Sequence, residues 1–274
     1  MSGQHKGSFV RIAGRGGGRR LSVEPVPTPV TMGLGAYRAI ESSPFGTVIA
    51  AFDRAVYLRL ANRVVALTAP SVPLGPLHVR LPRAPAGLGV GDTFHVPDEW
   101  RYRPTIWTGQ LPDRSTIGAD VLRALGAVAC HSPLLAPPLA RRWRAASRAR
   151  DLAQACQLLG GLGPGLTPSG DDALAGMLLA ARLHRPEAED DLVALADGVE
   201  THEISRAFLH WAARGQSVEP VHRLLAGDAT AGADLLANGH SSGADLALGL
   251  GYGLAESITG PWPGTPWFAP LAGG

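Results

Sequence analysis

The stretch Gly163-Pro-Gly-Leu-Thr-Pro-Ser-Gly-Asp-Asp172 is a glycine-rich turn that runs directly into a helical pattern. The apolar residues that follow have the i, i+3, i+4, i+7 spacing of one helix face: Leu174, Met177, Leu178 and Ala181. A helix is therefore predicted to begin within this stretch. It carries the strongest local signal in the chain.

The residue that caps this helix is open between two alternatives. In the first, Ser169 caps the helix and Asp172 reaches back to it as in a capping box. In the second, Thr167 is the cap and Pro168 takes the first helical position. Both alternatives place the helix start at the same turn.

The turn is also predicted to bind a small anion such as phosphate or a carboxylate. A helix start presents free backbone N–H groups and the positive end of the helix dipole, and glycines let a ligand approach without a Cβ in the way. Gly163, Gly165 and Gly170 are the expected N–H donors. The turn is not a Walker A loop, because no Lys-Ser/Thr follows the glycines.

A second segment repeats the pattern. Ser242-Gly-Ala-Asp245 with Gly249 matches Ser169-Gly-Asp-Asp172 with Gly176, so both read Ser-Gly-x-Asp-x-x-x-Gly. The second helix contains three alternate glycines: Gly249, Gly251 and Gly253. Each costs about 1 kcal/mol relative to Ala in a helix interior. Close packing against the first helix would offset this cost, so we expect the two helix starts to lie together.

Polar residues gather at these two helix starts in excess of what capping needs: Thr167, Ser169, Asp171, Asp172, His240, Ser241, Ser242 and Asp245. A cap needs one Ser or Asp, and so many buried polar groups would require partners. The excess favours a functional site, although the alternative of two simple helix caps with small-residue packing stays open.

The candidate catalytic residues are Asp171, Asp172, His240 and Asp245. Asp171 and Asp172 point about 100° apart on a helix, so we expect one to cap it and the other to orient a substrate amide or hold Mg²⁺. The sequence leaves open which of Asp171 and Asp172 has which role, and it assigns no set of metal ligands. His240 is either an acid/base group or a structural residue. The candidate substrate-binding residues are Gly163, Gly165, Thr167, Ser169, Gly170, Ser241, Ser242 and Gly243.

The remaining chain predicts an α+β fold. Between Val26 and Trp107, short β-favouring runs are separated by Pro and Gly: 47–52, 56–60, 64–68, 77–81 and 93–96. From Ala119 almost to Thr259 the spacing is helical, which gives a β-rich domain over 21–112 and a mostly α-helical domain over 113–274 that carries both motifs.

Within the helical part, Leu139–Leu159 is predicted as one long helix or two broken ones. Further helices are predicted at 190–199, 203–213, 218–225 and 231–236. Thr201 is the expected N-cap of the second of these, and Gly215 its expected stop.

Charge and composition exclude several classes of protein. Residues 1–20 hold five basic residues and no acid, which leaves 20 basic against 23 acidic residues elsewhere, so we expect no nucleic-acid binding and a flexible tail. No run approaches the roughly 20 apolar residues of a membrane span. Cys130 and Cys156 have no CxxC pairing and no secretory signal before them, so both are expected to be buried thiols of a cytoplasmic protein.

Part of the sequence resembles the bacterial AllH-type family. The resemblance rests on the two motifs (161–172 and 239–245), the intervening 201–215 helix and Glu219-Pro220. That family is named for a subunit of oxamate carbamoyltransferase, and the resemblance covers roughly Gly46 to Ser257. The chain departs from the family in its basic extension before Leu21 and in a hydroxyl position of the second motif, where the family often has Thr.

The resemblance implies a role in purine and allantoin nitrogen catabolism. There, an enzyme of several different subunits interconverts oxalurate and phosphate with oxamate and carbamoyl phosphate. A small anionic substrate and partner subunits are the implied partners. The alternatives are a non-catalytic anion-binding or assembly subunit and a different phosphoryl or acyl transfer enzyme with Mg²⁺ at the aspartates. A nucleic-acid role of residues 1–20 is the fourth and most distant interpretation.

Overall fold

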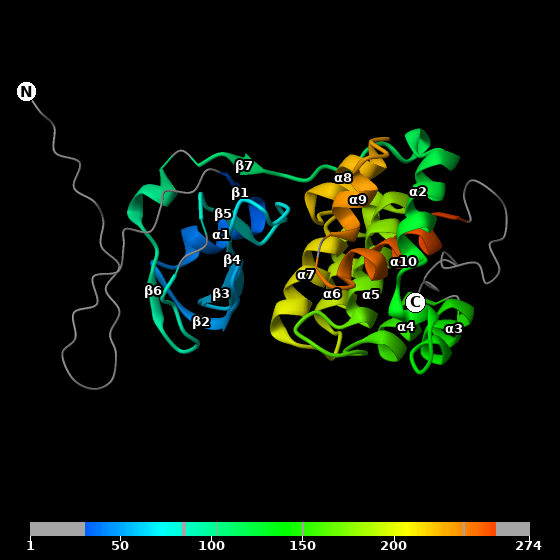
Figure 1. Ribbon diagram of the computed structural model, residues 1–274, viewed down its shortest axis with the longest axis horizontal. Coiled ribbons are helices and arrows are strands. Elements are labelled where there is room, and N and C mark those ends of the chain that lie inside the picture. The colour runs from blue at the N-terminus through cyan, green and yellow to red at the C-terminus, as the bar shows by residue number, and fades with distance from the viewer. Residues whose placement is uncertain (1–30, 84–85, 103, 150, 238, 256–274) are drawn as a thin grey trace, which may run out of the picture. The chain divides into compact units, whose positions relative to one another are not determined.

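The computed structural model describes residues 31–83, 86–102, 104–149, 151–237 and 239–255 (Figure 1). The tail predicted over residues 1–20 lies outside these residues. The chain divides between Thr108 and Gly109 into two compact units. The first unit carries a seven-stranded sheet and the second carries the helices from residue 119 onward, so the predicted α+β class is confirmed.

The sheet of the first unit has the strand order β6-β2-β3-β4-β5-β1-β7. Its strands are β1 (Thr31–Gly33), β2 (Phe45–Ala51), β3 (Ala55–Leu60), β4 (Arg63–Thr68), β5 (His78–Arg80), β6 (Thr93–His95) and β7 (Ile106–Trp107). The pairs β4–β5 and β1–β7 are parallel, and the other pairs are antiparallel. The five predicted β runs coincide with β2 to β6. A tight turn at 89–92 leads into β6, where the Asp92 N–H donates to the Gly89 carbonyl (3.1 Å).

Helix α1 (Leu34–Ser42) was not predicted, and it is the one α-helix among the described residues of the first unit. It buries Ala36, Ala39 and Ile40, a short i, i+3, i+4 stripe, in the core of the sheet. The chain enters this helix through Gly33, where a Cβ would lie 2.2 Å from the Gly75 carbonyl oxygen. Only glycine fits this approach of two backbones.

The second unit is built from helices. They are α2 (Ala119–Ala129), α3 (Ala140–Ala149), α4 (Leu152–Leu159), α5 (Ser169–His184), α6 (Glu189–Asp197), α7 (Glu203–Ala213), α8 (Glu219–Leu225), α9 (Ala231–Leu236) and α10 (Ser242–Ala255), with 3-10 turns that include η3 (Pro133–Leu135). The segment 139–159 forms two helices, because Asp151 accepts the Ala153 and Gln154 N–H groups and starts α4. No helix among these described residues is both long and apolar enough to cross a bilayer.

Two local predictions in this unit are wrong. His202, not Thr201, caps α7, since its Nδ1 accepts the Ile204 N–H, while the Thr201 hydroxyl donates to Asp171. Cys130 is exposed where α2 ends, whereas Cys156 is buried as expected. Burial raises the pKa of the Cys156 thiol to about 12, so this thiol stays protonated.

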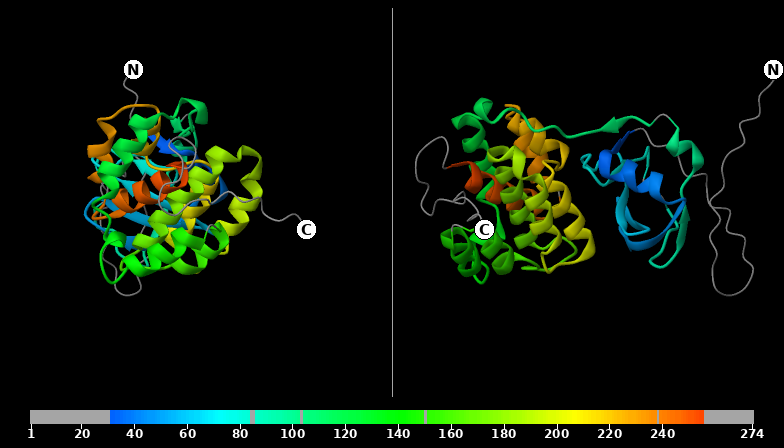
Figure 2. Two further views of the ribbon diagram at one scale, coloured as in Figure 1. Left: turned by 90° about the vertical axis from the view of Figure 1, so that its right-hand side faces the viewer. Right: turned by 180° about the vertical axis from the view of Figure 1, so that it is seen from behind.

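Helices α5 and α10 pack backbone against backbone in the second unit, and they lie side by side in Figure 1, with further views of the ribbon in Figure 2. A Cβ on Gly176 would lie 2.2 Å from the Leu246 carbonyl oxygen, and one on Gly249 would lie 1.9 Å from that of Ala173. Close packing on the first helix, the predicted reason for the glycines of the second helix, is confirmed for Gly249 and Gly253, whereas Gly251 faces Leu125 of α2.

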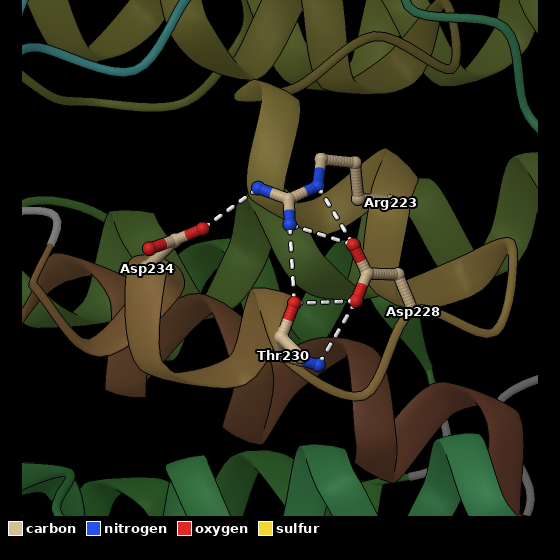
Figure 3. Close-up of polar contacts among 4 residues, drawn as sticks. All are labelled: Arg223, Asp228, Thr230 and Asp234. Atoms are coloured by element: carbon tan, nitrogen blue, oxygen red, sulfur yellow. Dashed lines mark hydrogen bonds and ion pairs between the residues drawn. The ribbon is translucent and has the colours of Figure 1, made fainter.

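The turn from α8 to α9, which leads toward the second motif, is held by a charged cluster (Figure 3). Arg223 donates from Nε and Nη2 to Asp228 Oδ2 (2.9 and 2.6 Å) and from Nη1 to Asp234 Oδ2 (2.7 Å). The other Asp228 oxygen accepts the Thr230 hydroxyl (2.6 Å) and N–H (3.0 Å). Each charged group of the cluster has a partner within the cluster, and these contacts fix the turn.

Candidate functional site

The two motifs meet where α5 and α10 begin. The hydroxyl oxygens of Thr167 and Ser242 lie 3.4 Å apart across the two helix starts. The expectation that these starts lie together is therefore confirmed.

The two motifs also interact reciprocally. Ser242 of the second motif interacts with Asp172 of the first, and Ser169 of the first interacts with Asp245 of the second. The glycine after each serine has an equivalent role, because a Cβ on Gly170 would lie 2.0 Å from the Leu159 carbonyl oxygen. In this arrangement each half of the repeat completes the polar surroundings of the other half.

Neither alternative for the cap of α5 is correct. Pro168 is the N-cap and no side chain caps this end, while Ser169 is the first helical residue. The Pro168 carbonyl accepts the N–H groups of Asp171 (2.9 Å) and Asp172 (3.1 Å). The hydroxyls of Thr167 and Ser169 are instead turned toward the α10 motif.

The glycines among the candidate substrate-binding residues divide into two sets. The Gly170 N–H donates to the Leu162 carbonyl (2.8 Å), so the expectation of a free N–H there is wrong. Gly243 is buried against Leu235, where a Cβ would lie 1.7 Å from the carbonyl oxygen, so it too serves packing. Gly163 and Gly165 have φ of +122° and +92°, and their N–H groups have no backbone partner within the described residues.

Asp171 is a buried anchor for the glycine turn. Its Oδ1 accepts the Gly161 N–H (2.8 Å), and its Oδ2 accepts the hydroxyls of Ser205 (2.7 Å) and Thr201. The side chain is 1% exposed. These three donors tie the base of the turn to α7, so the carboxylate is committed to holding the fold.

Asp172 has a different environment. Its Oδ2 is inaccessible to solvent and has no hydrogen-bond partner among the described residues. Burial raises its pKa well above the usual value, the charges of Asp245 and Asp171 raise it further, and the Ser242 hydroxyl opposes them. A carboxyl group in such surroundings keeps its proton at pH values where an ordinary Asp is ionised.

Asp245 is fully buried, and one of its oxygens is held from outside both motifs. The Ser132 hydroxyl, which precedes η3, donates to Asp245 Oδ1 (2.5 Å) and accepts the Leu134 N–H (3.1 Å). Asp245 Oδ2 has no partner in the described part of the chain. Burial raises the pKa of Asp245, whereas the hydroxyls of Ser132, Ser169 and Ser241 favour its charged form.

Sequence reasoning missed Ser132. It lies 113 residues before Asp245, alone and in no motif, so no local signal marked it. His240, by contrast, is exposed in the turn that leads into α10, beside Gly239 with a φ of +71°. The structure brings together Thr167, Ser169, Asp172, Ser241, Ser242 and Asp245, and it leaves His240 at the surface.

A metal site is not visible among these groups. Within the described residues, no three His, Cys, Asp or Glu side chains are placed to hold a metal ion together. Asp172 and Asp245 supply two carboxyl groups to one place, and the groups around them are hydroxyls. The arrangement suits a ligand that forms hydrogen bonds.

Comparison with known proteins identifies one family. Residues 159–254 match the family described as oxamate carbamoyltransferase subunit AllH. The matched stretch contains both Ser-Gly-x-Asp motifs and helices α5 to α10. No solved structure matches the chain.

Proposed function

We propose that this chain, whose helical unit is of AllH type, is a subunit of a carbamoyltransferase of the oxamate carbamoyltransferase kind and binds substrate between Asp172 and Asp245. The observation that carries the proposal is the pair of buried carboxyl oxygens without partners where the two motifs meet. A buried polar group without a partner costs roughly 1–3 kcal/mol, and a ligand that supplies the missing hydrogen bonds recovers this energy.

The reaction moves a carbamoyl group from the amide nitrogen of oxalurate to an oxygen of phosphate. A C–O bond forms, the C–N bond breaks, and the proton of the phosphate ends on the nitrogen of oxamate. The substrate must be held in line, and its carbonyl oxygen must be stabilised as negative charge develops.

The site supplies groups for these tasks. A carboxyl group that retains its proton can donate a hydrogen bond to a carbonyl oxygen, and burial favours that form of Asp172. The N–H groups of Gly163 and Gly165, in the turn that Asp171 anchors, are placed to receive the anionic end of the substrate. Partner subunits supply the rest of the catalytic machinery in this proposal, and we place the assembly in the cytoplasm.

Calorimetric titration of the purified full-length chain tests the proposal. Carbamoyl phosphate, phosphate, oxamate and oxalurate are each titrated with and without Mg²⁺, first into the unchanged chain and then into Asp172→Ala. We expect binding that is lost in the variant while its circular dichroism spectrum is kept.

A matched control is Asp191→Ala, which removes an exposed carboxylate from α6. It should leave the affinity unchanged, because Asp191 has no part in the site. Absence of binding by the folded chain, or binding that survives Asp172→Ala, would contradict the placement of the substrate between the two motifs. Phosphate release by the isolated chain only with Mg²⁺ would instead favour a metal-dependent phosphoryl transfer enzyme.

A further inference from the structure

The structure gives Asp172 and Asp245 unequal surroundings within the reciprocal arrangement of the two motifs. Asp245 receives a donated hydrogen bond from Ser132, whose oxygen already accepts the Leu134 N–H, so the hydroxyl proton of Ser132 is directed at the carboxylate. Asp172 interacts with Ser242, which also faces Thr167. The hydroxyls of Ser169 and Ser241 add to the donors around Asp245 alone.

This inequality decides which carboxyl group is the acceptor. Hydrogen bonds donated to a carboxylate favour its charged form, and two neighbouring carboxylates cannot both ionise easily. Asp245 has the larger set of donors and is therefore the ionised member of the pair. Burial raises the pKa of both carboxyl groups, but the Asp172 pKa is raised well above its usual value, because Asp172 also faces the charge of Asp245 and has the Ser242 hydroxyl alone to oppose it; Asp172 is therefore the member that carries the proton.

We propose that the pair recognises a neutral primary amide or ureido group, with Asp245 Oδ2 accepting its N–H and the protonated Asp172 donating to its carbonyl oxygen. An amide offers one donor and one acceptor side by side, and it is complementary to one ionised and one protonated carboxyl group. A carboxylate or phosphate offers acceptors only, so it leaves Asp245 Oδ2 unpaired and places a second negative charge beside it. The inference rests on the proposed function and names the part of the substrate that this site holds.

Ser132 is a positioning residue in this proposal. It contacts Asp245 and not the ligand, and its own side chain is 4% exposed. Its role is to keep Asp245 Oδ1 occupied, which leaves Oδ2 as the acceptor for the amide.

The test compares oxamate with oxalate, two probes of nearly equal shape in which an amide replaces a carboxylate. Both are titrated calorimetrically into the full-length chain at neutral pH. We expect oxamate to bind at least about fivefold more tightly than oxalate, because a mismatched buried polar group costs roughly 1–3 kcal/mol.

Two variants sharpen the comparison. Asp245→Asn removes the charge that repels oxalate and adds N–H donors, so the preference for oxamate should shrink or reverse. Ser132→Ala should reduce the ratio of the two affinities and leave the affinity for inorganic phosphate, which has no amide group, unchanged. Asp191→Asn makes the same chemical change as Asp245→Asn on an exposed site and should leave the ratio unchanged.

The outcomes separate the inference from the proposed function. Oxalate binding as tightly as oxamate, at a site abolished by Asp172→Ala, would overturn the amide preference and leave the substrate site in place. Absence of binding by every probe would overturn both. A preference for oxamate that Asp245→Asn does not alter would place amide recognition elsewhere and would likewise overturn the inference.

Discussion

Replacing Gly249 with Ala is predicted to destabilise the helical unit, although alanine is the better helix former. Helix propensity alone favours Ala by about 1 kcal/mol. However, the added Cβ would lie 1.9 Å from the Ala173 carbonyl oxygen and would meet the backbone of α5. Overpacking of a core typically costs about 1–3 kcal/mol, and more where only backbone can yield. At the upper end of that range, which a contact with backbone favours, the net loss after the gain in propensity is about 2 kcal/mol.

The matched control is Gly251→Ala, the same change two residues further along α10. There the Cβ would lie 3.5 Å from Leu125 Cβ, which is an ordinary contact, so propensity should prevail. We expect a gain of up to about 1 kcal/mol.

Urea unfolding followed by circular dichroism measures both variants. The midpoints should move in opposite directions while the slope with urea stays unchanged. In a thermal scan, each kcal/mol corresponds to roughly 2–4 °C for a unit of this size. If Gly249→Ala proved as stabilising as Gly251→Ala, the close backbone contact between α5 and α10 could not be the reason for glycine, and the packing argument would be wrong.

Three further predictions concern buried groups. Asp171→Asn leaves at least one of its three donors unsatisfied and should lower the free energy of unfolding by about 2 kcal/mol or more; urea midpoints equal to wild type would contradict its role as an anchor. The pKa of Asp172 is raised on folding, so the free energy of unfolding falls as pH rises above the ordinary Asp value. Asp172→Asn should therefore stabilise the protein more at pH 7 than at pH 4. An equal effect at both pH values would refute the raised pKa. A thiol reagent should modify Cys130 in the folded chain and Cys156 only after unfolding, and rapid modification of both would show that Cys156 is not buried.

One more prediction concerns acid. Burial lowers the pKa of His222 to about 4, below the ordinary value of 6.5, so the stability it contributes is complete above pH 6.5 and is lost as pH falls through 4. His222→Gln should therefore flatten the loss of stability between pH 6.5 and 4, measured as urea midpoints. An unchanged slope would assign the acid sensitivity to other groups.

The helices were predictable where periodicity was long and strong. The bounds 203–213 were predicted as observed for α7, because a clear apolar stripe and the left-handed Gly215 mark its extent. Helix α1 was not predicted because its apolar stripe is three residues long and the helix lies among strands in the sequence. The caps were the least predictable. No side chain caps the start of α5, and the hydroxyl of Thr201, the expected cap of α7, donates to Asp171 while His202 accepts the Ile204 N–H.

The site was predictable as a location but not as a division of roles. The repeated Ser-Gly-x-Asp pattern indicated that two helix starts lie together, and they do. Nothing in the sequence distinguishes Asp171 from Asp172, because that distinction depends on Thr201 and Ser205, which only the folded chain brings to Asp171. The role of Ser132 could not be predicted for the same reason, because only the folded chain brings it to Asp245.

The contact of α5 with α10 has a mechanical consequence. Two helices that meet backbone to backbone have no layer of flexible side chains between them, so neither can slide or rotate past the other without breaking the contacts at Gly176 and Gly249. The two helices therefore behave as one rigid unit, with Asp172 and Asp245 fixed near one end. Any adjustment to an arriving molecule must come from the short segments that lead into the two helices, 162–168 and 239–241. Amide hydrogen exchange should change there while the two helices stay protected.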